Sequence, residues 1–259
     1  MSAAGTVYLM GAGPGAPDLL TLRAARLLAE ADVVFFDALV HPDTVALAAR
    51  AEKVAVGKRC GRHSTAQQFI NKRLVDAARK HRVVARLKGG DPMLFGRAQE
   101  EISALEAAGI ACEVVPGITA ALAAAADLKT SLTQRGIARS VTFATPRVGT
   151  RESASAWADG LVASDAGAIY MGVGEARSIS EALIGGGKSG ALPVAVVENA
   201  SLPDRRIRYT TLRDLPRFAD ETVHGPALIL IGPQFVERAA ALEDAGAERC
   251  RPPMREAAG

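Results

Sequence analysis

Short apolar runs alternate with helical hydrophobic periods through most of this chain. Ten of these runs have the length and the β-branched content of strands and are bounded by glycine, proline or polar residues. The predicted strands span residues 6–11, 32–37, 53–57, 82–89, 112–117, 141–145, 167–172, 193–198, 206–211 and 227–232. Strands that alternate with crossover helices are typical of an α/β protein.

The segments between the strands carry helix signals. From Ile70 onward, apolar residues recur at i, i+4, i+7 and i+8, which predicts a helix with Ser64 or Thr65 as its cap. A second helix is expected over residues 97–108, where Gly109 would end it.

The texture of the sequence changes after Gly117, where an alanine-rich helix and a polar segment precede the second series of strands. We therefore expect two α/β domains with a cleft between them. The N-terminal domain would cover residues 1–116 and the C-terminal domain residues 117–245. Residues 246–259 are expected to form a disordered tail.

Composition and charge narrow the possible partners. The 259 residues carry 31 basic and 28 acidic side chains, a net charge of +3, without a long run of one sign. This pattern disfavours a nucleic-acid partner. The most apolar stretch, residues 118–126, is far shorter than the roughly 20 residues of a membrane span, and the N-terminus lacks a secretory signal. We expect a cytoplasmic protein without a membrane partner.

The cysteines point to neither a disulfide framework nor a zinc site. Cys60, Cys112 and Cys250 are odd in number, far apart and without C-x-x-C spacing. No cluster of histidine, cysteine or carboxylate residues suggests a metal, so no metal cofactor is expected.

Glycine-rich segments follow four of the first five predicted strands. They are GAGPG after the first strand, VGKR after the third, KGGDP after the fourth and PGITAA after the fifth. In open α/β sheets, ligands bind outside the carboxyl ends of the strands. These segments are therefore expected to converge on one site built from several loops.

The first of these segments has an alternative interpretation. Residues 11–16 match the G-x-G-x-x-A form of the dinucleotide fingerprint, and Asp37 ends the next strand near where a ribose-binding acid belongs. A nicotinamide or flavin oxidoreductase must therefore be considered. Against it, Pro14 and Pro17 lack amide donors for a pyrophosphate, and Pro17 suits a first helical position, so the helix is expected to start later than the fingerprint requires.

The KGGDP segment favours a cationic ligand. A fixed Asp91 carboxylate beside backbone donors would repel a phosphate unless a metal intervened, whereas it would attract an amino group or another organic cation. The alternative is that residues 89–92 form a tight turn in which Asp91 caps the next helix.

Nine segments together resemble one family. In order along residues 7–232 they are GAGPGAPDLLTLRA, FFDALV, VGKRCGRH, Q..IN, RLKGGDPMLFGR.QEE, VVPGITAA, YMG, VEN and PALILIG. Their order and spacing are similar to those of the S-adenosylmethionine-dependent tetrapyrrole methylases. The resemblance implies two α/β domains with the active site in the cleft between them, and a homodimer. It also implies S-adenosylmethionine as the cofactor, released as S-adenosylhomocysteine.

The resemblance also implies an activity. The segments VGKR, GGDPMLFGR and PGITAA favour a member that methylates uroporphyrinogen III at two pyrrole carbons, C-2 and C-7, giving precorrin-2 for sirohaem or cobalamin. The alternative is a methylase that acts on a later precorrin, or more distantly on a translation factor or ribosomal RNA. A non-catalytic binding module with the same fold stays open as well. Many relatives are fused to a dehydrogenase-ferrochelatase module, which we expect this chain to lack.

Individual site residues follow from matching this chain to the family motifs. The resemblance implies Asp37 as the proton acceptor and Lys58 as the proton donor, although Asp37 alternatively caps a helix near Pro42 and Lys58 alternatively pairs with a substrate carboxylate. For Met171 the alternative is ordinary core packing. The implied cofactor contacts are Pro14, Gly89, Gly90, Asp91, Leu94, Thr119, Ala120, Met171, Ala200 and Ala227.

A tetrapyrrole with eight carboxylates calls for guanidinium groups, which hold carboxylates in bidentate fashion. Many relatives carry GIPLTHR and TGH where this chain has LKTSLTQR (128–135) and TPRVG (145–149). Arg147 is expected to replace the missing histidine as a carboxylate contact. The candidate substrate-binding arginines are Arg59, Arg62, Arg97, Arg135, Arg139 and Arg147.

Overall fold

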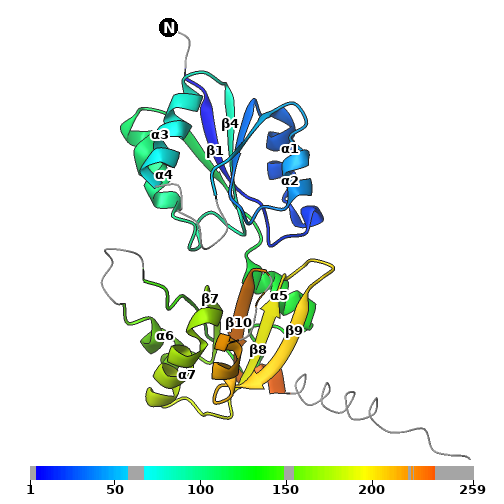
Figure 1. Cartoon of the computed structure of the whole chain (residues 1–259), viewed down its shortest axis with the longest axis vertical. Helices are drawn as coiled ribbons and strands as arrows, with labels where there is room; N and C mark the ends of the chain where they lie inside the picture. Colours follow the sequence, from blue (N-terminus) through cyan, green and yellow to red (C-terminus); the bar gives the residue numbers. More distant parts are fainter. Residues whose placement is uncertain (1–3, 58–66, 149–154, 221–222, 224, 237–259) are drawn as a thin grey trace, which may run out of the picture. The chain divides into compact units, whose positions relative to one another are not determined.

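The computed structural model describes residues 4–57, 67–148, 155–220, 223 and 225–236. The chain divides into two compact units, each with its own sheet (Figure 1). The first unit comprises Met1–Ala123 and Asn199–Asp204, and the second comprises Ala124–Glu198 and Arg205–Gly259. Within the described residues, none of the helices combines the length and the apolar character that a bilayer-spanning helix needs.

The first unit is built on a parallel five-stranded sheet with the order β3-β2-β4-β1-β5. A short 3-10 helix, η1 (Pro17–Leu19), precedes α1. The strands and helices are β1 (Thr6–Gly11), α1 (Leu22–Glu30), β2 (Val33–Phe36), α2 (Pro42–Ala46), β3 (Glu52–Ala55), α3 (Gln67–Ala78), β4 (Val83–Lys88), α4 (Ala98–Ala107) and β5 (Ala111–Val115). Helix α5 (Ala120–Leu128) follows β5 and spans the division between the units.

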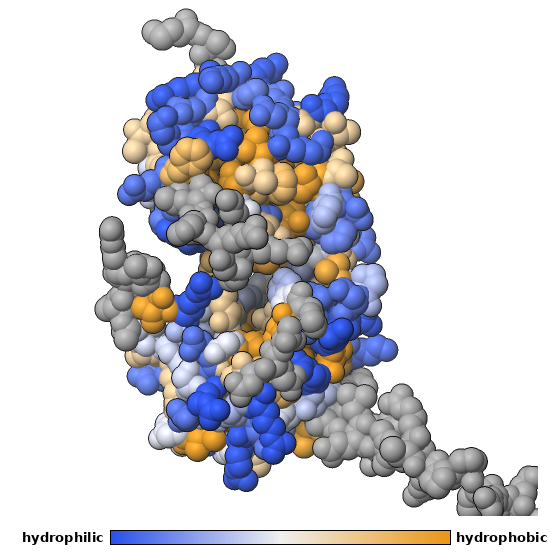
Figure 2. Space-filling view, viewed as in Figure 1, coloured by the Kyte–Doolittle hydropathy of each residue, from blue (hydrophilic) through white to orange (hydrophobic). Residues whose placement is uncertain are grey.

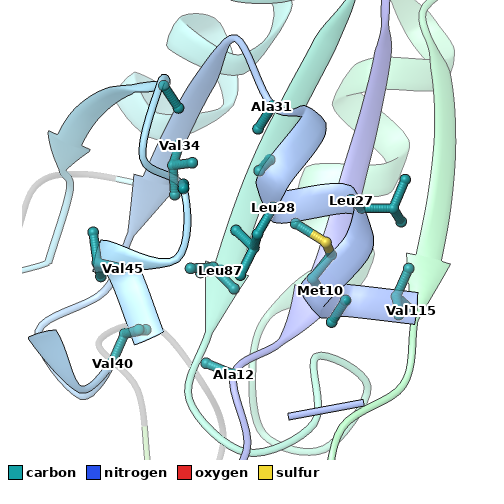
Figure 3. Close-up of a cluster of buried hydrophobic side chains, with 14 residues drawn as sticks. Met10, Ala12, Leu27, Leu28, Ala31, Val34, Val40, Val45, Leu87 and Val115 are labelled. Carbon is teal, nitrogen blue, oxygen red and sulfur yellow. The ribbon is translucent and has the colours of Figure 1, made fainter. Parts of the chain in front are cut away.

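Helices cover both faces of this sheet, because neighbouring residues of a strand point to opposite faces. On one face, Met10 and Leu87 pack against α1 and α2 (Figure 3). On the other face, Leu9 and Val84 pack against α3 and α4. In the space-filling view, hydrophobic side chains are visible between these two helix layers, and hydrophilic side chains surround them (Figure 2). Leu28 and Leu74, one on each face, are fully buried.

The second unit holds a mixed sheet with the order β6-β7-β10-β8-β9, in which only the β6–β7 pair is parallel. One core cluster, which includes Ile169, Ile179 and Ile229, packs α6 and α7 against the sheet. Three 3-10 helices are η2 (Val173–Glu175), η3 (Leu215–Asp220) and η4 (Pro233–Phe235). The other elements are β6 (Val141–Ala144), α6 (Trp157–Ala163), β7 (Ala166–Tyr170), α7 (Ala176–Gly185), β8 (Pro193–Glu198), β9 (Arg206–Thr211) and β10 (Ala227–Ile231).

The structure contains all ten strands predicted from the sequence, with shifts of one or two residues at some ends. The expected α/β fold class is confirmed. The predicted helix over 97–108 is α4, and Gly109 ends it with φ 68°. The proposed caps Ser64 and Thr65 lie outside the described residues. The domain limits at 116 and 245 stay predictions, and the expected tail 246–259 also lies outside the described residues.

Candidate functional site

The glycine-rich loops after β1 and β4 are joined by backbone hydrogen bonds at the carboxyl edge of the parallel sheet. Gly13 and Gly90 form an antiparallel bridge, in which Gly90 N donates to Gly13 O over 2.7 Å and Gly13 N donates to Gly90 O over 3.2 Å. Ala12 N also donates to Lys88 O over 2.7 Å. The convergence expected from the sequence is therefore present for these two loops.

The loop after β5 packs directly against the other two. A Cβ on Gly11 would lie 2.5 Å from Gly117 Cα, and a Cβ on Gly117 would overlap Gly90 O. These two glycines are thus required by contact between loops of the chain itself. Gly90 is different, because its φ of 67° is the left-handed conformation that glycine adopts without strain, and no atom blocks its Cβ direction closely.

Asp91 links the second and third of these loops. Its Oδ1 accepts a hydrogen bond from Met93 N and its Oδ2 accepts one from Gly117 N, each over 2.8 Å. The bond to Met93 N is the local turn contact considered for this segment. Asp91 is only partly buried, and each carboxylate oxygen has a second lone pair, so an ammonium group can still bind there. The turn and a cationic ligand are therefore compatible.

The segment between β8 and β9 also belongs to this region of the first unit. Ala16 N donates to Ser201 Oγ over 3.0 Å, and a Cβ on Gly15 would meet the Leu202 side chain. Ala200, which directly precedes Ser201, is buried, with 7% of its surface exposed. The loop that carries Pro14 is thus tied to the loop that carries Ala200.

Two further family-implied cofactor residues lie in the second unit on neighbouring strands. Leu228 pairs with Tyr170, so Met171, which follows β7, and Ala227, which opens β10, are neighbours across the pair. Met171 is 46% exposed and has φ 55°. The core-packing interpretation of Met171 is therefore wrong.

Backbone strain gathers in the segments that carry the motifs. Four of the described non-glycine residues with left-handed φ lie in motifs quoted above: Phe95 and Arg97 in GGDPMLFGR, Met171 in YMG, and Asn199 in VEN. Such conformations cost about 1–3 kcal/mol each and persist where the surrounding structure fixes them. This distribution suggests that these loops are shaped for binding.

The Asp37 carboxylate forms an ion pair at the end of β2. Arg86 Nη2 donates to Asp37 Oδ1 over 2.7 Å, and 28% of the Asp37 side chain is exposed. Helix α2 is capped instead by His41, whose Nδ1 accepts from Asp43 N, so Asp37 is not the cap of that helix. Lys58, the implied partner in proton transfer, lies outside the described residues.

The sequence interpretation missed the buried charges behind Asp37. Arg86 and Lys88 lie two residues apart on the central strand β4, and both contact Glu101 of α4. Burial is the largest influence on the pKa of Lys88 and, together with the Arg86 charge, lowers it below its usual value, although Glu101 and Asp37 oppose this shift. Two basic residues on one face of an apolar strand were a usable signal, because buried charges require partners.

The structure describes four of the six candidate substrate arginines, Arg97, Arg135, Arg139 and Arg147. Arg59 and Arg62 lie outside the described residues. Arg135 and Arg147 are exposed in the second unit, and Arg97 pairs with Glu100 through Nε over 2.7 Å. That ion pair lowers the pKa of Glu100.

The polar segment after α5 has an anchor that the sequence did not reveal. Gln234, 5% exposed, donates from Nε2 to Leu132 O over 3.1 Å. A β-bridge between Gln134 and Ala138 closes a turn just after this contact, and Arg135 lies within the turn. The segment 128–135 is therefore anchored by a residue about one hundred positions away along the chain.

Comparison of the sequence with known protein families identifies the family of this chain. The family model for Tetrapyrrole (Corrin/Porphyrin) Methylases matches residues 6–216. The chain belongs to the tetrapyrrole methylase family. The resemblance based on the nine segments is thereby confirmed.

The alternative of a dinucleotide enzyme needs a helix that starts at the fingerprint. In this structure the segment after the fingerprint forms η1, which begins at Pro17, and α1 begins only at Leu22, with Thr21 as its cap.

Similar methylases include proteins of known structure. A uroporphyrin-III C-methyl transferase from Thermus thermophilus, complexed with S-adenyl homocysteine, is 39% identical, with a TM-score of 0.79 over 90% of this chain and 100% of that one. A cobalt precorrin-4 methyltransferase is 30% identical, with a TM-score of 0.76 over 88% of this chain and 94% of that one.

A siroheme synthase from Pseudomonas fluorescens SBW25 is 45% identical over 91% of this chain. This chain spans about half the length of the curated relatives that it matches, 51% in this case.

Among the described residues, no group of three or more His, Cys, Asp or Glu side chains is arranged to hold a metal ion.

Proposed function

We propose that this methylase transfers methyl groups from S-adenosylmethionine to two pyrrole carbons, C-2 and C-7, of uroporphyrinogen III, giving precorrin-2 for sirohaem or cobalamin biosynthesis. The observation that carries the proposal is the 39% identity over the full length of a uroporphyrin-III C-methyl transferase complexed with S-adenyl homocysteine. The 30% identity to a precorrin-4 methyltransferase makes a later precorrin the second candidate substrate.

The cofactor would bind at the glycine-rich loops. A sulfonium cofactor that also bears an ammonium group is the organic cation that the Asp91 carboxylate favours. Asp91 keeps acceptor capacity beyond its bonds to Met93 N and Gly117 N, as described above. The residues proposed to bind the cofactor are Pro14, Gly89, Gly90, Asp91, Leu94, Thr119, Ala120, Met171, Ala200 and Ala227.

The chemistry asked of the protein is mainly positioning. A pyrrole carbon supplies the electron pair for the new C–C bond, while the S–CH₃ bond breaks and its electron pair stays on sulfur as the neutral thioether. A C–H proton of the macrocycle then leaves, and its electron pair remains in the ring system. We assign Asp37 as the acceptor of this proton and Lys58 as a proton donor, a general acid-base pair.

Arginines would hold the carboxylates of the tetrapyrrole. We propose Arg59, Arg135 and Arg147 for this role, because a guanidinium pairs with carboxylate through two parallel hydrogen bonds. An Arg147→Ala variant tests the one of the three that is expected to replace a histidine of the family motif. Its KM for the tetrapyrrole is expected to rise about tenfold, and an unchanged KM would remove Arg147 from the site.

The test of the activity is an anaerobic incubation with uroporphyrinogen III and S-adenosylmethionine, followed by mass spectrometry of the tetrapyrrole. A gain of two methyl groups is the expected result. The absence of any gain, together with retained binding of S-adenosylmethionine in a calorimeter, would reject uroporphyrinogen III and favour a later precorrin. The absence of both would reject the cofactor assignment.

We also propose that the protein is a cytoplasmic homodimer, in keeping with the family resemblance and with the three scattered cysteines that suggest a reducing compartment. Light scattering coupled to size exclusion would test the dimer, since a mass equal to one 26.9 kDa chain would contradict it.

A further inference from the structure

Four charged side chains form a cluster beneath the carboxyl edge of the parallel sheet. We call Asp37, Arg86, Lys88 and Glu101 the charge cluster. Arg86, Lys88 and Glu101 are each at most 3% exposed. Charges this deeply buried are costly unless they are paired, and here two cations face two anions. The cluster is thus balanced in charge, and only Asp37 has substantial exposure, at 28% of its side chain.

Arg86 connects Glu101 to Asp37. Its Nε donates to Glu101 Oε1 over 3.1 Å, and its Nη2 donates to Asp37 Oδ1 over 2.7 Å. Its Nη1 donates to Leu87 O over 2.9 Å. Because the guanidinium is a rigid plane, these three bonds together determine its orientation. The position of Arg86 in turn determines where the Asp37 carboxylate is held.

Glu101 is itself fixed from several sides. Lys88 Nζ contacts both of its oxygens, over 3.0 and 3.1 Å, and Gln67 Nε2 donates to Oε1 over 3.1 Å. The groups come from different elements, with Gln67 on α3, Glu101 on α4, and the two basic residues on β4. Glu101 is fully buried, so water does not compete for these bonds.

Stability alone is a weak reason for such a cluster. Replacing a buried ion pair by apolar side chains of similar volume is often neutral or stabilising. A role in orienting Asp37 accounts for the direction of the chain of contacts, which runs from a fully buried anion through Arg86 to the partly exposed carboxylate. It also accounts for the choice of arginine, since a lysine cannot contact both carboxylates with the same planar group.

We propose that Glu101 is a positioning residue that acts through Arg86 to fix the Asp37 carboxylate for proton acceptance. This inference rests on the proposed function, in which Asp37 takes the proton that leaves the macrocycle. Lys88 supplies the second cation, which balances the charge of Glu101 in the sheet interior. Glu101 itself does not contact the substrate.

The test is a double-variant cycle that keeps the net charge of the cluster constant within each comparison. The pair Lys88→Met and Glu101→Gln removes one charge of each sign and is introduced into the wild-type protein and into Asp37→Asn. Single-turnover methylation of uroporphyrinogen III gives the rate, and calorimetry gives the affinity for S-adenosylmethionine. Leu105→Ala, a buried core change one turn along α4, serves as the control for lost stability alone.

In the wild-type background, the paired substitution is expected to lower the methylation rate about 10- to 100-fold, while affinity for the cofactor stays unchanged. In the Asp37→Asn background, it is expected to cause no further loss, because Glu101 acts only through Asp37. Leu105→Ala is expected to lower the thermal midpoint and to leave the rate unchanged when it is measured well below that midpoint.

Three results would overturn the inference. The first two are a wild-type rate in the paired variant, and a further loss of rate when the pair is added to Asp37→Asn. Either would reject the positioning role of Glu101 but keep Asp37 as the proton acceptor. A wild-type rate in Asp37→Asn itself would reject the assignment of Asp37 and the inference together. If the paired variant does not fold, Glu101→Asp replaces it, since this change keeps the charge but withdraws the carboxylate by one methylene, and the same loss of rate is expected.

Discussion

Replacement of Asp91 by asparagine separates the two roles of that side chain. Asparagine has nearly the same shape but no charge, and only one of its two side-chain polar atoms accepts hydrogen bonds. It can therefore keep a bond from either Met93 N or Gly117 N, but not both of the 2.8 Å bonds that the carboxylate accepts. The turn should survive in weakened form, whereas the attraction for a cation should be lost.

The two effects have different magnitudes. One lost hydrogen bond at a partly exposed site reduces the free energy of unfolding by about 1 kcal/mol. Removal of the charge that faces an ammonium should weaken S-adenosylmethionine binding about 10- to 100-fold, equivalent to about 1.4–2.8 kcal/mol. The loss in cofactor affinity should therefore exceed what a loosened loop explains.

Isothermal calorimetry with S-adenosylmethionine and urea unfolding measure the two effects separately. Asp32→Asn is a control for the loss of a carboxylate charge elsewhere, because Asp32 Oδ2 accepts bonds from Arg82 N and Val83 N over 2.9 Å each at the amino edge of the same sheet. Because one amide oxygen can keep both of these bonds, we expect Asp32→Asn to lose little stability and no cofactor affinity. Wild-type affinity in Asp91→Asn would refute the charge argument and leave the turn as the whole role of Asp91.

Three further predictions concern stability and reactivity. Gly117→Ala should reduce the free energy of unfolding by about 1–3 kcal/mol, because its Cβ would overlap Gly90 O, while Gly174→Ala, in open space, should not; equal urea midpoints would contradict this. Burial raises the pKa of Cys112 to about 11, so its alkylation at pH 8, followed by peptide mass spectrometry, should be about 100-fold slower than that of a thiol with pKa 9.0. Burial lowers the pKa of Lys88 below 10.5, so the unfolded chain binds more protons at this residue than the folded chain does. The difference in the free energy of unfolding between the wild-type protein and Lys88→Met should therefore rise with pH up to about 10.5. A difference that does not change with pH would argue against the shift.

The secondary structure was largely predictable because its signals are local. Each of the ten strands is a short apolar run bounded by turn residues, and each is present in the structure. The absence of a helix at the fingerprint itself was predictable for the same reason, since Pro17 suits a first helical position and η1 begins there. The segment VVARLK illustrates the limit, because its pattern marks β4 as a strand but not as the strand between β2 and β1.

The candidate site was predictable only in part. Glycine segments at strand ends predicted that the loops converge, and Asp91 stood out as an anion among backbone donors. The Asp37 carboxylate was noticed, but its partner was not, because Arg86 lies 49 residues away along the chain. Such a contact depends on which strands are neighbours in the sheet.

By itself, then, the sequence determined the elements, the α/β class and the motifs that mark the methylase family, since these depend on residues that are close along the chain. Only the tertiary structure decided that Gly11 and Gly117 are needed for contact between two loops, and that Glu101 holds both Arg86 and Lys88. These features depend on distances between residues on different strands and helices. A carboxylate on α4 becomes the partner of two cations on β4 only when that helix packs on that face of the sheet.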